Sequence, residues 1–310
     1  MKREKVTMKD IAKELNLSLA TVSYVLNHSE KEKISHDTRF KVLETAKKLG
    51  YVPNQSAKSL AKSHSNLIGI IVNIGKSVSS YSKQQALDLA GELQQQIYQS
   101  GYDTILSVTQ DFEEFQIKYK HSLEAAFIID IDEKALKKIT KHYYVPLVFL
   151  DCDFEETLFY KVLPDYDYII REAKKKLETE QPYLIMGQII NERLKDQIIT
   201  HFRPEDIFIN RSSANLKEFL SERVSQRGII IGDLLGLQVE RYVDNSNILV
   251  LSSNIATDLL LPDTKRIIVS NHQKAVIAVE ILKKLLTMDY DETSNTRILL
   301  LPDPIAELLF

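Results

Sequence analysis

The residue types that most often do chemistry show no catalytic or metal-binding spacing in this chain of 310 residues. Its seven histidines stand at positions 28, 36, 64, 121, 142, 201 and 272, and their spacing matches no zinc site. There is no G-x-S-x-G motif that would indicate a nucleophile elbow. The single cysteine, Cys152, lies between Asp151 and Asp153, whose negative charges raise the pKa of a thiol. We therefore expect a buried, inert cysteine, no metal, no cofactor and no enzymatic activity.

One segment comes close to a phosphate-binding loop. Residues 69–77 contain Gly69, Gly75, Lys76 and Ser77, but the two glycines are one residue too far apart for a P-loop. Gly69 also falls inside an expected strand, where its amide is not free to bind phosphate. We reject a nucleotide site here, and keep Lys76 and Ser77 as residues that could line a ligand cleft because they follow a strand.

Chemistry of another kind is indicated near the start of the chain. Residues 18–27 fit a short helix whose apolar face holds Val22, Val25 and Leu26. The opposite face is small and polar enough to approach phosphates and base edges; it carries Ala20, Ser23, Tyr24 and Asn27. Hydroxyl and amide donors that suit phosphate oxygens are found on Ser18, Thr21, Ser23 and Asn27.

Three short helices are predicted in this region. Thr7 is the expected N-cap of the first, which runs to about Leu15, with Asp10 completing a capping box. Ser18 caps the second helix, and Ser35 caps a third that ends in Lys47-Lys48-Leu49-Gly50. Two short helices joined by a three-residue turn have the proportions of a helix-turn-helix, whose second helix enters the major groove of DNA.

The charge distribution agrees with this interpretation. The whole chain has a net charge of −3, but residues 1–66 carry +6 and the remainder carries −9. A basic head on an acidic body predicts that only the head meets a polyanion.

From Leu67 onward, apolar runs alternate with amphipathic stretches, which predicts an α/β body with parallel sheets. The predicted strands are 67–73, 103–108, 125–130, 146–151, 183–187, 228–233, 248–252, 266–270 and 297–301. The predicted helices are 81–100, 133–143, 166–178, 192–202, 216–223 and 272–288. So many strands favour two doubly wound lobes.

Three motifs at matching spacing resemble a known family. Residues 6–12 (VTMKDIA), 21–27 (TVSYVLN) and 50–54 (GYVPN) are similar to the DNA-binding headpiece of lactose-repressor/galactose-repressor (LacI/GalR) regulators. The resemblance covers about the first 62 residues. It implies a helix-turn-helix headpiece at residues 1–53, a hinge helix or linker at 54–66, and a homodimer that binds a palindromic double-stranded operator, most often as a repressor.

The resemblance also implies which residues contact DNA. In the headpiece these are Thr7, Ser18, Leu19, Ala20, Thr21, Ser23, Tyr24 and Asn27. Leu19, Ala20 and Tyr24 would face the bases. The family usually has arginine at the position of Tyr24, and tyrosine cannot make the bidentate contact of arginine to guanine, so we expect an altered operator.

The hinge adds Asn54, Ala57, Lys58, Leu60 and Lys62. Leu60 matches the leucine that wedges between the central base pairs in the minor groove. Ala57 and Ala61 would let two copies approach closely, and Lys58 and Lys62 would reach flanking phosphates. A helix this short is marginal alone, so we expect it to fold on the operator.

For residues 67–310 the resemblance is to the family's periplasmic-binding-protein-like effector and dimerisation domain. It implies a first lobe of about 67–163 plus 271–290, a second of about 164–270 plus 291–310, and a ligand between them at the carboxyl ends of the strands. Several motifs depart from the family, including Gly232-Asp233 where it has Asn-Asp. The candidate effector-binding residues are Lys76, Ser77, Asp151, Arg193, Asp233 and Asn254.

The effector itself stays open at this point: a sugar or derivative, consistent with a role in carbohydrate metabolism, or an altered or absent ligand. One alternative is a regulator controlled by a protein corepressor through a degenerate cleft. Another is a sugar-binding or enzymatic α/β protein with incidental DNA binding. The charged start MKREKVTMKD and the absence of an apolar run of about 18 residues predict a cytoplasmic protein that does not bind membranes.

Overall fold

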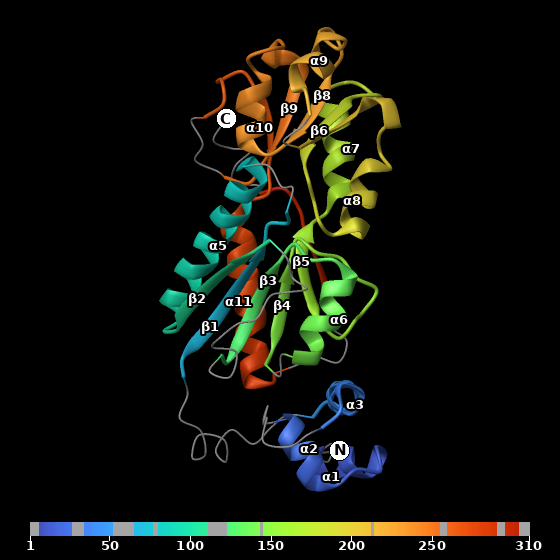
Figure 1. The fold of residues 1–310 in the computed structure, drawn as a ribbon, viewed down its shortest axis with the longest axis vertical. Helices are drawn as coiled ribbons and strands as arrows, with labels where there is room; N and C mark the ends of the chain where they lie inside the picture. The colour runs from blue at the N-terminus through green and yellow to red at the C-terminus, as the bar shows by residue number, and fades with distance from the viewer. Residues whose placement is uncertain are drawn as a thin grey trace, which may run out of the picture.

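The computed structural model describes residues 6–26, 34–51, 65–76, 80–110, 123–142, 145–211, 214–254, 259–289 and 295–303. A head of three helices lies at one end of an elongated molecule, and two α/β lobes follow it in line (Figure 1). None of the described helices is long and apolar enough to cross a membrane.

The head consists of α1 (Met8–Glu14), α2 (Leu19–Leu26) and α3 (His36–Lys48). The predicted caps are confirmed. The Thr7 amide donates to the Asp10 carboxylate over 2.8 Å, as a capping box requires, and the hydroxyl oxygens of Ser18 and Ser35 accept from the amides of Thr21 and Thr38 at 3.0 and 3.2 Å. The helices share a small apolar core, made of Ile11, Ala12, Val22, Val25, Leu26, Val42, Ala46 and Tyr51.

The first lobe is built on a six-stranded sheet in the order β11-β5-β4-β3-β1-β2, in which every pair is parallel. Its strands are β1 (Leu67–Asn73), β2 (Asp103–Thr109), β3 (Ala125–Ile129), β4 (Leu147–Leu150), β5 (Tyr160–Pro164) and β11 (Arg297–Leu300). Helices α5 (Ser80–Gln99) and α11 (Asn271–Thr287) share one apolar core with the sheet, and α6 (Glu133–His142) shares the other.

The second lobe has a five-stranded parallel sheet in the order β10-β9-β8-β6-β7. Its strands are β6 (Tyr183–Gly187), β7 (Ile207–Asn210), β8 (Gly228–Ile231), β9 (Ile248–Ser252) and β10 (Lys265–Ile268). Helices α7 (Tyr166–Lys176) and α8 (Glu192–Ile199) cover one face. The other carries α9 (Leu216–Ser221) and α10 (Asp233–Val239), and two 3-10 turns, Pro204–Asp206 and Asn245–Asn247, complete the lobe.

The lobes are joined where the chain passes from β5 to α7, from β10 to α11, and after β11. At each passage the backbone is tied to a neighbouring segment: the amide of Asp165 donates to Leu300, that of Asn271 to Ser253, and that of Asp303 to Ile268, over 2.8 to 2.9 Å.

One predicted boundary is wrong. Residues 291–310 were expected in the second lobe, but β11 pairs with β5 in the first sheet, with Arg297 in register with Lys161. The physical reason is that α11 packs on α5 in the first lobe, so the short connection after it returns the chain to the nearest edge of the same sheet. The sequence prediction also missed β5, β7 and α10.

The expected burial of Cys152 is confirmed, as is the direction in which its pKa is shifted. Its side chain is fully buried, its thiol donates to the carbonyl of Leu150 over 3.1 Å, and its sulfur accepts from the amide of Ile131. Burial is the main cause that raises its pKa well above the ordinary value.

Candidate nucleic-acid interface and interlobe cleft

The first turn of α2 presents an open surface. Leu19 keeps 44% of its side chain exposed although it is large and apolar, and Ser18 and Ala20 are exposed beside it. Tyr24 lies one turn further along the helix and is half-buried. The opposite side of α2 is held in the head core by Val22, Leu26 and their neighbours. A rigid helix with one free face and small residues at its start is the geometry that enters a major groove.

The head touches the first lobe through α3, its helix nearest to the lobes (Figure 1). The Lys47 ammonium donates to the carbonyl of Thr157 over 3.2 Å and lies 6.0 Å from the ring centroid of Tyr160. Partial burial lowers the pKa of Lys47. An apolar cavity of about 110 Å³, with Phe40 and Phe159 among its walls, lies beside this contact.

The two lobes are clamped directly to each other at the start of α8. The carboxylate of Asp130, which follows β3 in the first lobe, accepts from the amides of Ile190 and Asn191 in the second lobe, each at 3.0 Å. The buried Asn191 amide donates to Ile131 over 2.7 Å and accepts from the amide of Leu194, so it caps α8 as well. Burial is the main cause that raises the pKa of Asp130 to about 7, against the hydrogen bonds that lower it.

A second ionic contact lies beside the clamp. The Lys274 ammonium, only 5% exposed, donates to both carboxylate oxygens of Asp151 at 2.7 and 2.9 Å. Asp130, Asp151 and Tyr166 line a cavity of about 90 Å³ between the lobes. This volume is small for a ligand site, because the clamp brings the lobes together.

A larger cavity of about 590 Å³ opens between α5 and the second lobe. Its polar walls include Asp88, Glu92, Asp233, Asn254, Asn271 and His272. The amide of Ser253 donates to Asp233 over 3.3 Å, and burial is the main cause that raises the pKa of this carboxyl. His272 and Glu92 pair over 3.1 Å at the mouth. The carboxyl ends of β8, β9 and β10 in the second sheet therefore meet a polar cleft of the size that takes a small ligand, closed on the first-lobe side by α5 and the start of α11.

A family model described as "Bacterial regulatory proteins, lacI family" matches residues 7–54. The maltose regulon regulatory protein MalI of Vibrio furnissii is 35% identical over 122 residues, which cover 39% of this chain and 80% of that protein. The chain belongs to the LacI family. The HTH-type transcriptional regulator MalR of Staphylococcus xylosus is 34% identical over 152 residues, 47% of this chain and 44% of MalR. The match thus spans less than half the length of MalR.

Solved LacI-type structures share the fold over nearly the whole chain. The lac repressor dimer bound to operator superposes with a TM-score of 0.58 at 19% identity, covering 96% of this chain and 98% of that one. The transcriptional regulator CelR in complex with cellobiose gives a TM-score of 0.59 at 15% identity, with the same coverage. The predicted fold class, a helix-turn-helix head and a two-lobed α/β body, is confirmed.

Within this LacI-family fold, three of the six candidate effector residues line interlobe cavities: Asp151 the smaller, Asp233 and Asn254 the larger. Lys76 is exposed after β1 and lines none of the described cavities. Ser77 lies outside the described residues, as do Asn27 and the hinge residues Asn54, Ala57, Lys58, Leu60 and Lys62.

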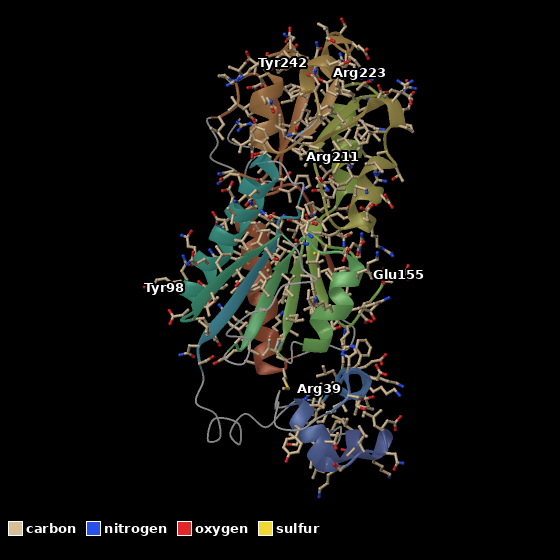
Figure 2. All side chains as sticks on the ribbon, in the orientation of Figure 1. Arg39, Tyr98, Glu155, Arg211, Arg223 and Tyr242 are labelled. Atoms are coloured by element: carbon tan, nitrogen blue, oxygen red, sulfur yellow. The ribbon has the colours of Figure 1, made fainter. Side chains whose placement is uncertain are left out.

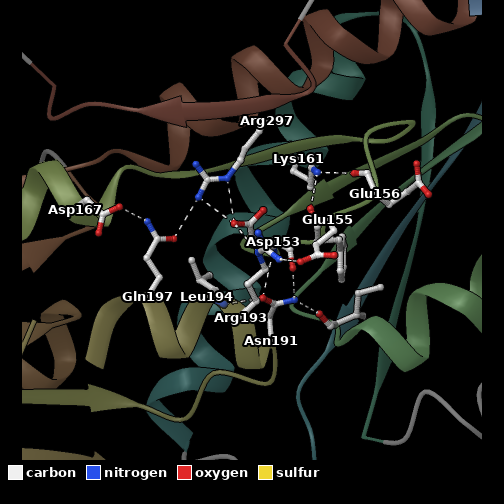
Figure 3. A network of polar contacts seen from close by, with 12 residues as sticks. Asp153, Glu155, Glu156, Lys161, Asp167, Asn191, Arg193, Leu194, Gln197 and Arg297 are labelled. Atoms are coloured by element: carbon white, nitrogen blue, oxygen red, sulfur yellow. Dashed lines mark hydrogen bonds and ion pairs between the residues drawn. The ribbon is translucent and has the colours of Figure 1, made fainter. Parts of the chain in front are cut away.

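Arg193 was expected to face the ligand, and the structure places it elsewhere. It projects from α8 toward the chain after β4, where it pairs with Glu155 at 2.9 Å and Asp153 at 3.6 Å (Figure 3). The buried Asp153 also holds Arg297 at 2.9 Å, and Arg297 donates to Gln197 of α8 over 3.3 Å. This network ties α8 to the first lobe from the side, so Arg193 supports the lobe junction and not the cavity.

Four residues of the lobe junction were not predicted from the sequence. Asp130 and Asn271 line the cavities, and Asn191 and Lys274 bond to Asp130 and Asp151 beside them. Asp130 carried the same signal that selected Asp151, an aspartate at the end of an apolar strand. Asn191 carried an N-cap signal before α8. For Lys274 and Asn271 the only signal was a polar residue at the start of a helix, which is too common to select a site.

Proposed function

We propose that the protein is a DNA-binding transcriptional regulator, a repressor, that acts as a homodimer on a palindromic double-stranded operator. The exposed first turn of α2, within a head that matches the lacI-family model, is the observation that carries this proposal. The positive charge of residues 1–66 supplies the attraction to phosphate. A regulator of this kind works in the cytoplasm, beside the chromosome, and the proposal includes no catalytic step.

Each DNA-contacting residue has a proposed role. Leu19, Ala20 and Tyr24 face base edges, and Tyr24 gives a base preference other than that of an arginine. The proposed phosphate contacts are Thr7, Ser18, Thr21, Ser23 and Asn27. In the hinge, Leu60 is the proposed minor-groove wedge, with Ala57 at the dimer axis and Asn54, Lys58 and Lys62 near the backbone.

The edge of the first lobe supports the homodimer. β2 is an edge strand of its sheet, and Leu106 and Val108 on it are 48% and 40% exposed. Tyr98, at the end of the neighbouring α5, is 75% exposed and projects outward (Figure 2). An apolar edge of this kind fits a second copy related by a two-fold axis, which matches a palindrome.

The interlobe cleft is the proposed effector site, with Asp151, Asp233 and Asn254 among its contacts. The relatives include a maltose regulon regulatory protein and the sucrose operon repressor of Klebsiella pneumoniae, so we propose a sugar or derivative as effector and carbohydrate genes as targets. The comparisons favour neither a corepressor-controlled regulator nor an enzyme with incidental DNA binding.

The test is selection of bound fragments from the source genome by the purified full chain at physiological salt. We expect a few palindromic sites. The Ala20→Glu variant places a carboxylate on the exposed face of α2 and should recover none of them. Gln181→Glu, which makes the same charge change on the far lobe, should recover all. Diffuse recovery that disappears as salt rises would overturn the proposal, since that is the signature of non-specific binding.

A further inference from the structure

The larger interlobe cavity contains polar groups that the protein itself leaves unsatisfied. Asn271 is only 6% exposed and lines both cavities, and its side-chain amide has no hydrogen-bond partner among the residues that the structure describes. One carboxylate oxygen of Asp233, Oδ1, is buried and has no partner there either. A buried polar atom without a partner costs free energy, which applies to Asp233 Oδ1, and the Asn271 amide adds donor and acceptor groups that a ligand in the cavity can use.

The charges around the cavity are almost all of one sign. Asp88, Glu92 and Asp233 line it, and His272 is the one residue with a cationic form among its described walls. His272 is already paired with Glu92, and Gln84 donates to Asp88 over 2.8 Å. The charge of Arg266 acts on Asp233, but Arg266 does not line the cavity and burial still dominates at Asp233.

The smaller cavity adds little net charge, because Asp151 is paired with Lys274 and the pKa of Asp130 is raised to about 7. The uncompensated negative charge is therefore that of the larger cavity. A neutral sugar can donate hydroxyl hydrogen bonds to such walls, but it cannot offset their negative charge. A ligand with an ammonium group does both, because hydrogen bonds between charged groups are about twice as strong as neutral ones.

We infer that the cleft binds an aminated polyol, such as an amino sugar. Its ammonium group faces the carboxylates of Asp88, Glu92 and Asp233, and one of its hydroxyl groups hydrogen-bonds to the side-chain amide of Asn271. This rests on the proposed function only in taking the cleft as the effector site. A phosphorylated or carboxylated sugar is excluded from the cavity by repulsion from the same three carboxylates.

The test compares matched probes on the full chain at pH 6.5, by calorimetry. The probes are glucosamine, galactosamine and mannosamine, each against the parent hexose and the hexose 6-phosphate. At least one amino sugar should bind about tenfold or more tightly than its parent hexose, a difference of about 1.4 kcal/mol. The 6-phosphate of that hexose should bind more weakly than the hexose itself.

Two variants locate the effect. Asp233→Asn keeps the shape of the side chain and removes its charge, so it should reduce the preference for the amine several-fold. Asp263→Asn makes the same change at an exposed position outside the cavity and should leave the preference intact. The inference is overturned if no amino sugar binds more tightly than its parent, if the phosphate binds best, or if Asp233→Asn leaves the preference unchanged. Operator binding of the same preparations is measured separately, so a failure here is distinguishable from a failure of the proposed function.

Discussion

Replacing Asp130 by asparagine should remove a pH dependence from the stability of the protein. In the folded chain this carboxyl is buried between the lobes, close to Asp132 and Asp151, and its pKa is raised from 3.8 to about 7. Its oxygen Oδ1 accepts both second-lobe amides at 3.0 Å, from Ile190 and Asn191. An asparagine oxygen in the same place can accept both, so Asp130→Asn keeps the clamp and deletes only the titration.

The sign and size of the effect follow from linkage. Between about pH 4 and pH 7 the folded chain holds this proton and the unfolded chain does not, so the free energy of unfolding falls as the pH rises. The stabilisation that the protonated Asp130 carboxyl gives the folded chain is complete below about pH 4 and absent above about pH 7. At about 1.4 kcal/mol per pH unit, the full window corresponds to about 4 kcal/mol, and the part between pH 5.5 and 7 to about 2 kcal/mol.

Urea unfolding followed by circular dichroism at pH 5.5, 6.5 and 8 gives the measurement. The difference in free energy of unfolding, wild type minus Asp130→Asn, should fall by about 2 kcal/mol from pH 5.5 to pH 8. Asp130→Ala serves as the comparison, because it removes the titration and also leaves the Ile190 and Asn191 amides without their acceptor. It should be destabilised at every pH. A wild-type-minus-Asn difference that stays constant or rises with pH would refute the account of Asp130.

Three further outcomes are expected. Asn191→Ala removes the cap of α8 and the hydrogen bonds to Ile131 and Asp153, so it should lower the free energy of unfolding by roughly 2–4 kcal/mol. It should also raise the radius of gyration measured by X-ray scattering, and an unaltered radius would argue against a clamp between the lobes. Leu60→Ala should reduce operator bending in a gel-phasing assay while the melting temperature stays constant, and unchanged bending would reject the wedge. Tyr24→Arg should shift the base preference at one symmetric position per half-site, as read by operator selection, and identical preferences would mean that residue 24 reads no base.

The head was predictable because its signals are local. An N-cap residue and its hydrogen-bond partner three residues on are fixed by helix geometry, so Thr7, Ser18 and Ser35 took the places that their spacing indicates. The long strands of the lobes were predictable for a similar reason. β1 and β3 are continuous apolar runs, as strands covered on both faces are.

β5 was not predicted because Lys161 is its second residue and Pro164 its last, and both are untypical of a buried strand. Lys161 is 3% exposed, and its ammonium donates to the carbonyls of Phe154 and Glu156 at 2.9 and 2.6 Å. A buried lysine is tolerable only where the surrounding loop supplies such acceptors, and that loop is placed by the tertiary fold. β7 was missed because Ile207–Asn210 is a short edge strand with an alternating burial pattern.

The site was only partly predictable because it is shared between lobes. A strand-end rule finds Asp151, Asp233 and Asn254, since each follows a strand of one lobe at its carboxyl end. It says nothing of which side chain meets the other lobe. Asp130 binds the second lobe because the start of α8 lies against it. Arg193 points away from the cleft because it pairs with Asp153 and Glu155.

The cleft and the head contact opposite ends of the same two elements of the first lobe. β4 begins at Leu147, beside the head contact, and is followed at its other end by Asp151 in the cleft. α11 begins at Asn271 in the cleft and reaches Leu285 at the head, about 21 Å away at 1.5 Å per residue. The ion pair of Asp151 and Lys274 joins β4 to α11 at the cleft end. Because both elements lie in the packed core of the lobe, a ligand cannot bend one of them alone. Under the proposed function, an effector that rearranges this ion pair therefore acts on the head by turning the first lobe as one body, and in a dimer such a turn changes the separation of the two hinges.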